Sequence, residues 1–390
     1  MFIPLARPQL ISIATLPPLS LYIHIPWCVR KCPYCDFNSH EIKTALPEKR
    51  YVNALLQDLE QTLPEIWGRK IHSIFFGGGT PSIFSAEAID ELLCAARALL
   101  PLDVNAEVTL EANPGTVDAS KFAAFRAAGI NRLSLGIQSF NKDSLRALGR
   151  IHDDRQAHVA IKNALKFFDN VNLDLMYALP GQNLADALVD IKQAINYAPS
   201  HISAYYLTLE PNTLFHRRPP EGLPSHDSGA EMQTAIEYTL IEAGYDHYET
   251  SAFAKKSQRC RHNLNYWQFG DYLGIGAGAH SKISFCTAIQ RTARVKHPQA
   301  YIEKVSQRAH IETTQQLGRD DLGLEFMMNA LRLNKGFAAS LFAERTGLPL
   351  KHIEVQLSAA QAKGFIEWGT THIQPTQLGR KFLNDLLLHF

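Results

Sequence analysis

The sequence predicts an α/β protein in which a partial (β/α)6 barrel is followed by a small winged-helix-like α+β domain. In the first half of the chain, six apolar, β-branched or aromatic runs alternate with helical patterns, as in a parallel sheet with crossover helices. Each of these runs ends at a polar or glycine-containing segment. Near the C-terminus, short helical patterns surround two strand-like runs with the pattern of a hairpin.

The six predicted strands are separated by helical patterns such as Ala86–Leu100, Ala119–Ala128 and Leu184–Tyr197. In α/β barrels the reactive site is built at the C-terminal ends of the strands. The segments that follow the six runs therefore form the candidate site. The strands are predicted at Leu19–Ile25, Ile71–Phe76, Ala106–Glu111, Arg132–Ile137, Val171–Tyr177 and Ile202–Thr208.

Residues with suitable chemistry occupy these strand ends. The glycines 77–79 lack a Cβ, so the backbone there is free to approach a ligand and to point its N–H groups at an anion; a tight turn is the plainer interpretation. Thr80 offers a cap or a hydroxyl contact. Glu111 offers an acceptor for ribose hydroxyls or an ammonium group. Asp174 lies in an apolar run, where an unpartnered carboxylate is costly to bury, which favours a partnered, functional aspartate.

Three cysteines, Cys28, Cys32 and Cys35, follow the first predicted strand. Thiolates bind iron–sulfur clusters, usually four to a cluster. Three thiolates in one loop would hold a 4Fe–4S cluster with one open iron, and an open iron chelates the amino and carboxylate groups of a small molecule. The alternatives are a redox pair of cysteines and a zinc site with Asp36, His40 or His24 as the fourth ligand.

The composition restricts the class of protein. Lysine and arginine total 39 against 38 acidic residues, so the charge does not favour nucleic acid or an anionic membrane as a partner. The remaining cysteines are scattered, as suits a reducing cytosol. No apolar stretch approaches a membrane span, and the N-terminus lacks the pattern of a signal peptide. We expect a cytoplasmic protein with a poorly ordered arm over residues 1–18.

The C-x3-C-x2-C spacing, with an aromatic residue just before the last cysteine, resembles the radical S-adenosylmethionine (SAM) superfamily. The resemblance implies that SAM fills the open position of a 4Fe–4S cluster held by Cys28, Cys32 and Cys35. It also implies that the GGGTP segment binds the amino-acid end of SAM. By the same resemblance, the SAM pocket is lined by Tyr22, Tyr34, Gly78, Gly79, Thr80, Glu111, Gln138, Arg150, Asp174 and Leu207.

Four segments narrow the resemblance to one branch. The segments 21–28, 35–38, 148–152 and 261–267 together are similar to the HemW group of haem chaperones, which are related to oxygen-independent coproporphyrinogen III oxidase (HemN). The resemblance extends from about Pro17 to the C-terminus. The oxidases carry a further cysteine two residues after the third, where this chain has Phe37. The missing cysteine counts against decarboxylation of coproporphyrinogen III.

The segment from His262 to Trp267 matches the H-N-x-x-Y-W signature that is associated with haem binding in HemW proteins. Imidazole is a standard axial ligand of haem iron, and the guanidinium of Arg261 suits a propionate. We therefore predict that His262 binds the haem iron. Cys260 and His280 are the alternative ligands, and a satisfied histidine beside an aromatic cluster is the plainer interpretation.

Four regions are predicted: the arm over residues 1–18, a radical SAM core over 19–245, a connecting region with the HNxxYW motif over 246–314, and a HemN-type winged-helix-like domain over 315–390. The glycine-rich segment 270–280 lacks G-x-G-x-x-G and is assigned no nucleotide. Mixed charges in the last region favour a lid or partner-docking role over DNA binding. Its predicted elements are helices at Leu322–Leu331, Ala338–Thr346, Lys351–Gly364 and Leu378–Leu388 and a hairpin at Phe365–Trp368 and His372–Pro375.

The favoured hypothesis is a haem chaperone that delivers haem to haem-requiring apoproteins such as respiratory enzymes, with the cluster and SAM in a structural or regulatory role. Contact with the inner face of a membrane would be transient and would run through the partner, and the motifs leave room for a homodimer. One alternative is a coproporphyrinogen III oxidase-like radical SAM oxidoreductase. Another is a radical SAM enzyme that uses haem as electron acceptor.

Overall fold

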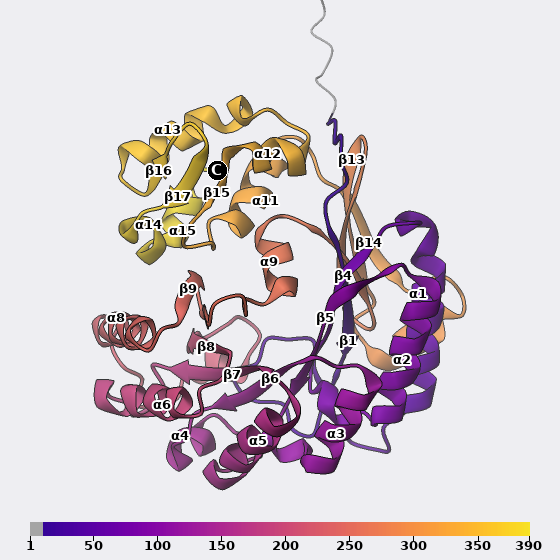
Figure 1. The fold of residues 1–390 in the computed structure, drawn as a ribbon, viewed down its shortest axis with the longest axis vertical. Helices are drawn as coiled ribbons and strands as arrows, with labels where there is room; N and C mark the ends of the chain where they lie inside the picture. Colours follow the sequence, from indigo (N-terminus) through magenta and orange to yellow (C-terminus); the bar gives the residue numbers. More distant parts are fainter. Residues whose placement is uncertain (1–10) are drawn as a thin grey trace, which may run out of the picture.

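The computed structural model describes residues 11–390 of the chain, and its centre is a curved parallel sheet (Figure 1). All six predicted strands are present and hydrogen bond in chain order, each parallel to the next. Three lie within one residue of the predicted bounds; β4 ends two residues later, β5 begins four residues earlier and β8 ends two residues earlier than predicted. The strands are β1 (Leu19–Ile25), β4 (Ile71–Gly78), β5 (Leu102–Ala112), β6 (Arg132–Gln138), β7 (Asn170–Tyr177) and β8 (His201–Tyr206).

Helices cover the outer, convex face of this sheet (Figure 1). Side-chain caps fix the start of most of them. Ser85 accepts a hydrogen bond from the Ala88 N–H at the start of α2, and Asp153 and Asn183 form reciprocal capping boxes with Gln156 and Asp186 at α5 and α6. The helices are α1 (Glu48–Ile66), α2 (Ala86–Leu99), α3 (Ala119–Ala128), α4 (Lys142–Ala147), α5 (Asp154–Phe167), α6 (Leu184–Asn196), α7 (Leu214–Arg217) and α8 (His226–Glu242), with 3-10 turns η1 (Pro81–Ile83) and η2 (Pro114–Thr116).

The region 246–314, predicted as a connecting region with the HNxxYW motif, adds strands to the central sheet. Its strands extend the sheet at both edges, and the strand that follows Gly270 pairs parallel to β1 with Leu21 opposite Leu273. Buried charge hid this strand from pattern analysis: Asp271 pairs with Lys282 and Arg69, each at 2.8 Å. The elements are β9 (Asp246–Glu249), β10 (Ala252–Ala254), α9 (Arg261–Trp267), β11 (Asp271–Ile275), β12 (His280–Phe285), β13 (Ala288–Arg294), α10 (Pro298–Val305) and β14 (Ile311–Gln316).

The complete sheet has the order β14-β13-β12-β11-β1-β4-β5-β6-β7-β8-β10-β9. Its two edge strands, β14 and β9, do not pair with each other in the described residues 11–390, so the barrel is open, as predicted. The short helix α9 lies inside the curve of the sheet, where it contacts β1, β4 and β11 on one side and the C-terminal domain on the other (Figure 1).

The C-terminal domain has a core of its own, and part of the N-terminal arm belongs to it. Ile11 and Ile13 are buried in that core, and the Ile13 N–H donates to the Cys286 carbonyl at 2.9 Å. Residues 11–18 therefore differ from the predicted poorly ordered arm, because their apolar side chains have a surface to cover; residues 1–10 lie outside the described part. The predicted last helix is divided at Phe382, which has non-helical backbone angles.

The elements of this domain lie close to their predicted positions. The strands form a separate three-stranded sheet, and the helices pack on it. They are α11 (Asp321–Ala330), β15 (Phe337–Ala338), α12 (Ala339–Thr346), η3 (Leu350–Ile353), α13 (Glu354–Ala362), β16 (Ile366–Trp368), β17 (His372–Pro375), α14 (Gln377–Lys381) and α15 (Leu383–Leu387).

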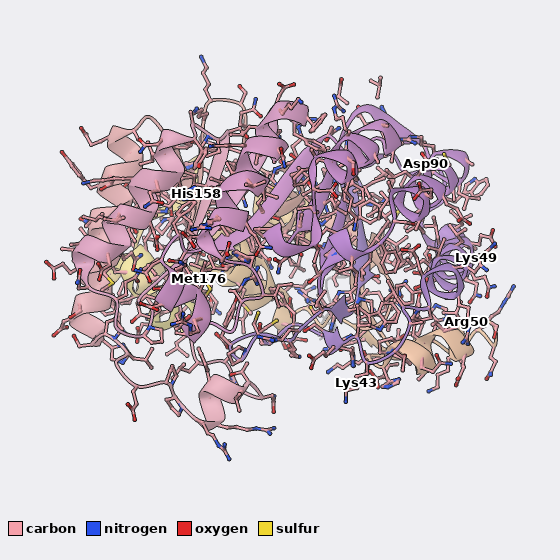
Figure 2. All side chains as sticks on the ribbon, turned by 90° about the horizontal axis from the view of Figure 1, so that it is seen from below. Lys43, Lys49, Arg50, Asp90, His158 and Met176 are labelled. Atoms are coloured by element: carbon pink, nitrogen blue, oxygen red, sulfur yellow. The ribbon has the colours of Figure 1, made fainter. Side chains whose placement is uncertain are left out.

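The outer helices carry exposed charges of both signs. Figure 2 shows Lys49 and Arg50 on α1 and Asp90 on α2, all of them exposed. No helix in residues 11–390 is long and apolar enough to cross a membrane.

Candidate functional site

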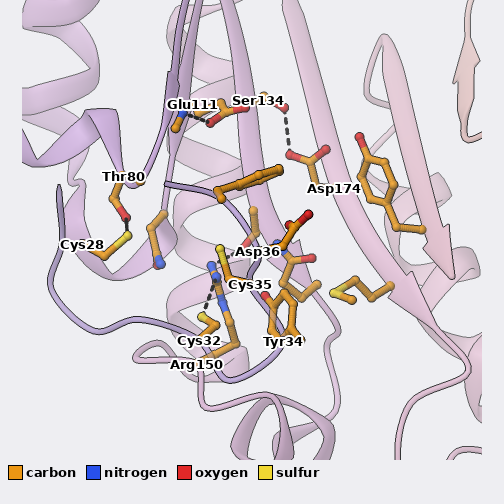
Figure 3. A pocket seen from close by; sticks show the side chains of 18 of the residues that line it. Cys28, Cys32, Tyr34, Cys35, Asp36, Thr80, Glu111, Ser134, Arg150 and Asp174 are labelled. Carbon is orange, nitrogen blue, oxygen red and sulfur yellow. Dashed lines mark hydrogen bonds between the residues drawn. The ribbon is translucent and has the colours of Figure 1, made fainter. Parts of the chain in front are cut away.

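A cavity of about 350 Å³ lies at the C-terminal ends of the parallel strands, where the sequence predicts the site (Figure 3). Loops and strand ends that are far apart in the sequence meet there. All three cysteines of the motif line it, together with nine of the ten predicted SAM-pocket residues. These nine are Tyr34, Gly78, Gly79, Thr80, Glu111, Gln138, Arg150, Asp174 and Leu207.

The cysteines lie on the loop of residues 26–40, here named the cluster loop, which begins and ends with the short paired strands β2 (Trp27–Cys28) and β3 (His40–Glu41). The Thr80 hydroxyl donates to the sulfur of Cys28 at 3.3 Å, and an Arg150 N–H lies 3.6 Å from the sulfur of Cys32. Burial raises the pKa of the Cys28 and Cys35 thiols. The Thr80 hydroxyl and the Arg150 guanidinium would stabilise the negative charge of thiolates that bind a metal group.

The three thiols line the cavity without converging on one point. In the described part of the chain, no three His, Cys, Asp or Glu side chains converge closely enough to hold one metal ion. The thiols of Cys28, Cys32 and Cys35 instead border one side of the cavity, which fits the larger iron–sulfur group (Figure 3).

The glycine segment brings β4 against β1 and the cluster loop. Gly78 has φ +113°, and a Cβ there would lie 2.5 Å from the imidazole of His24. A Cβ on Gly79 would lie 2.5 Å from the Trp27 carbonyl oxygen. The glycines are thus required by close backbone packing at this edge. The Gly78 N–H also donates to Glu111 at 3.3 Å, which joins the ends of two strands.

Two half-buried carboxyl groups, those of Glu111 and Asp174, face the interior of the cavity. Burial, reinforced by the negative charge of Asp174, raises the pKa of Glu111 to about 8. Burial also raises the pKa of Asp174, although Ser134 and Asn172 each donate a hydrogen bond to it at 2.8 Å. These carboxyl groups can accept hydrogen bonds from hydroxyl or ammonium donors of a ligand, and a bound cation would favour their ionised form.

The lining of the cavity also includes Arg150, Tyr34, Gln138 and Leu207. Arg150 is held by the Gly136 carbonyl, to which it donates at 2.8 Å. Gln138 has φ +66°, an uncommon conformation for a residue with a side chain. Leu207 is buried, and its N–H donates to the Tyr177 carbonyl at 3.0 Å.

Sequence reasoning missed several residues that line the cavity. Ser134 and Met176 lie on β6 and β7, and Tyr205 and Tyr206 end β8. Their position near the C-terminal ends of predicted strands was the available signal. Tyr22, predicted for the SAM pocket, instead lines a second cavity beside the first, and its hydroxyl lies 3.0 Å from Nδ1 of His24.

His262, the predicted haem ligand, lies inside the barrel and lines neither cavity. Its side chain is 1 % exposed and stacks on Phe75, with ring centroids 4.9 Å apart. Nδ1 lies 2.9 Å from the Ser73 hydroxyl, and Nε2 lies 3.1 Å from the hydroxyl of Tyr266. Burial lowers the pKa of His262 to about 3, so the imidazole is neutral.

The open parallel barrel with three cysteines after its first strand defines a radical SAM protein. The chain matches the Radical SAM superfamily over residues 22–194 and the HemN C-terminal domain over residues 317–382. Membership of this superfamily implies a 4Fe–4S cluster and SAM.

The comparison with whole proteins is more specific. The chain is 47 % identical over 374 residues to the heme chaperone HemW of Escherichia coli (strain K12), covering 95 % of this chain and 98 % of that protein. It is 48 % identical over 378 residues to the heme chaperone HemW of Haemophilus influenzae, covering 95 % and 97 %. The chain belongs to the HemW family. Its fold is similar to coproporphyrinogen III oxidase (HemN) from Escherichia coli, with a TM-score of 0.81, 23 % identity, and coverage of 96 % and 90 %.

Proposed function

We propose that the chain binds haem and delivers it to haem-requiring proteins, among them respiratory enzymes. The names of its relatives in the HemW family support haem binding. The observation that carries the proposal against the oxidase alternative is Phe37. Its ring is 59 % exposed and lines the cavity of the cysteines, at the position where the oxidases have a further cysteine.

In this proposal Cys28, Cys32 and Cys35 hold a 4Fe–4S cluster, and SAM lies between the glycine segment and the strand ends. The bound cluster would supply the electron for reductive cleavage of the sulfonium of SAM, or the cluster and SAM together would stabilise the C-terminal end of the barrel. Among the chain's own residues, Glu111 accepts hydrogen bonds from the donors of the ligand, while Gly78 and Gly79 let the end of β4 pack closely against His24 and the cluster loop.

The HNxxYW segment is proposed to contribute to haem binding through α9. Direct ligation by His262, as the sequence predicts, requires the Tyr266 hydroxyl to leave Nε2, because Nε2 is otherwise occupied and the ring is buried. Delivery to a membrane-bound enzyme is proposed to run through contact with that partner, and a homodimer is compatible with the proposal.

The test is an anaerobic assay on the full chain with its cluster reconstituted. The reduced protein is incubated with SAM and coproporphyrinogen III, and a parallel sample is titrated with haem. We expect saturable haem binding and no protoporphyrinogen IX. Product formed at a catalytic rate would make the chain an oxidase and contradict the proposal.

The variant Phe37→Cys, which restores the cysteine of the oxidases, is the matched control for the Phe37 argument. If this variant still makes no product, Phe37 alone does not separate the two functions, and the haem titration then decides whether the chain is a carrier.

A further inference from the structure

A second cavity, here named the chamber, lies directly beside the cavity of the cysteines. Its volume is about 660 Å³, within the range of roughly 300–1,000 Å³ that is usual for sites that bury a ligand. The two cavities share wall residues from the cluster loop and the strand ends. The shared residues are Cys35, Asp36, Phe37, Gly78 and Glu111.

The chamber exists because β11 runs parallel to β1. The C-terminal ends of both strands therefore lie at the same edge of the sheet, and the turn after β11 returns the chain there at His280, the first residue of β12. Asn38 of the cluster loop fixes this edge. Its amide donates to the carbonyls of Ala277 and Lys296, each at 2.9 Å. The chamber is thus built between the cluster loop and the strand extension.

The walls of the chamber combine aromatic rings with cations. Tyr266 and Tyr272 pack edge to face with ring centroids 4.6 Å apart, and Phe37 adds an exposed ring from the cluster loop. The ammonium group of Lys31 is held by the Phe37 and Ser39 carbonyls at 3.1 and 3.2 Å, and Lys296 is exposed. Flat apolar surfaces with a cationic rim match a flat apolar ring system that carries carboxylates.

Three histidines line the chamber, and they differ in what their ring nitrogens contact. Both nitrogens of His24 are engaged, one by Tyr22 and the other by the Asn38 carbonyl at 2.8 Å. His40 has a buried Nε2 without a hydrogen-bond partner in the described part of the chain. His280 is exposed, and its ring has no hydrogen-bond partner within residues 11–390.

We propose that the chamber is the porphyrin site of this chain and that His280 is the imidazole that binds the haem iron, with Lys296 and Lys31 facing the propionates. This inference rests on the proposed function. In this arrangement His262 is a positioning residue, because its Nε2 contacts the hydroxyl of Tyr266, whose ring forms part of the wall. His280 reaches haem without rearrangement of the barrel interior, whereas His262 does not.

The acidic residues on the chamber are compatible with this ligand. Only Asp36 and Glu111 contribute carboxyl groups to its lining within the described residues. Asp36 is exposed to solvent, and burial with the nearby charge of Asp174 holds the pKa of Glu111 at about 8, so it is mostly uncharged near pH 7. The side chains of Lys31 and Lys296 therefore determine the charge that a porphyrin carboxylate meets.

The test is a spectral titration of the full, cluster-reconstituted chain with ferric haem, using the wild type, His280→Ala, His262→Ala and the control His226→Ala, an exposed histidine on α8. We expect His280→Ala to weaken haem binding at least tenfold and to lose the spectrum of imidazole-ligated iron, with free imidazole restoring that spectrum. His262→Ala is expected to keep imidazole ligation. His226→Ala is expected to match the wild type.

A second variant, His280→Cys, distinguishes the loss of an iron ligand from a loss of folding. If His280 binds the iron, this variant shows the spectrum of a thiolate-ligated haem while its cluster absorbance is unchanged. Wild-type affinity and spectrum in His280→Ala, or an unchanged spectrum in His280→Cys, would overturn the chamber assignment alone. A wild-type chain that shows no saturable haem binding would overturn the proposed function and this inference together.

Discussion

Glu107 holds the haem-motif helix inside the barrel, and its removal should loosen α9. Its side chain is 6 % exposed and accepts hydrogen bonds from the N–H groups of Arg261 and His262, each at 3.2 Å. The carboxylate also interacts electrostatically with buried Arg132. A hydrogen bond to a charged group contributes about 1.5–3 kcal/mol, so Glu107→Ala removes at least about 3 kcal/mol from the local stability of α9.

Hydrogen exchange measures this loss directly. Each 1.4 kcal/mol is about tenfold in an equilibrium constant, so amides of α9 are expected to exchange about 100-fold faster in Glu107→Ala. Glu107→Gln keeps one acceptor oxygen and should show a smaller effect, and Glu87→Ala, exposed on α2, should show none. Unchanged exchange of α9 in Glu107→Ala would refute the idea that this carboxylate anchors the helix.

Three further predictions concern the barrel. In the folded, ligand-free protein the pKa of Glu111 is about 8, against 4.5 in a free carboxyl, so the folded protein binds this proton more tightly than the unfolded chain. The Tm of the protein should therefore fall as the pH rises from 5 to 8. The variant Glu111→Gln should reduce that fall. Gly79→Ala places a Cβ 2.5 Å from a backbone oxygen of the cluster loop and should weaken SAM binding in equilibrium dialysis at least tenfold, whereas Gly369→Ala, with 3.4 Å of room, should not. Asp58→Ala leaves buried Arg294 unpaired and should cost about 3–5 kcal/mol, seen as a lower Tm; if the Tm is unchanged, the pair is not a stabilising contact.

The fold was predictable where the side chains follow simple patterns. β1 runs from Leu19 to Ile25 as predicted, because every second residue is a large aliphatic one and all but Tyr22 are buried. The strands β11 to β13 were not predictable in the same way. Their pattern includes Asp271, Lys282 and Arg294, which are buried only because they pair with one another or with partners far away in the sequence. In the sequence such charged residues resemble exposed surface residues, because their partners in the tertiary structure are not known.

The candidate site shows the same division. The strand-end rule predicted where the site lies, since parallel strands place their C-terminal ends together. The family resemblance named the pocket residues, and nine of them line one cavity. Neither the rule nor the resemblance indicated that Tyr22 lines the second cavity or that His262 is buried inside the barrel. Whether a side chain on β1 or α9 faces one cavity, its neighbour or the barrel interior depends on the position of β11, which no local pattern indicates. His280 was noted in the sequence as an alternative ligand, but its exposure at the chamber required the turn after β11.

The central claim is that the chain carries haem and delivers it by contact. The most direct measurement is the rate of haem transfer from the loaded protein to the haem-free form of a respiratory enzyme, followed by the visible spectrum and compared with transfer to an excess of apomyoglobin. We expect a rate of transfer to the respiratory acceptor that rises with acceptor concentration and exceeds the rate of release to apomyoglobin. Equal, concentration-independent rates for both acceptors would mean that haem merely dissociates, and would contradict delivery.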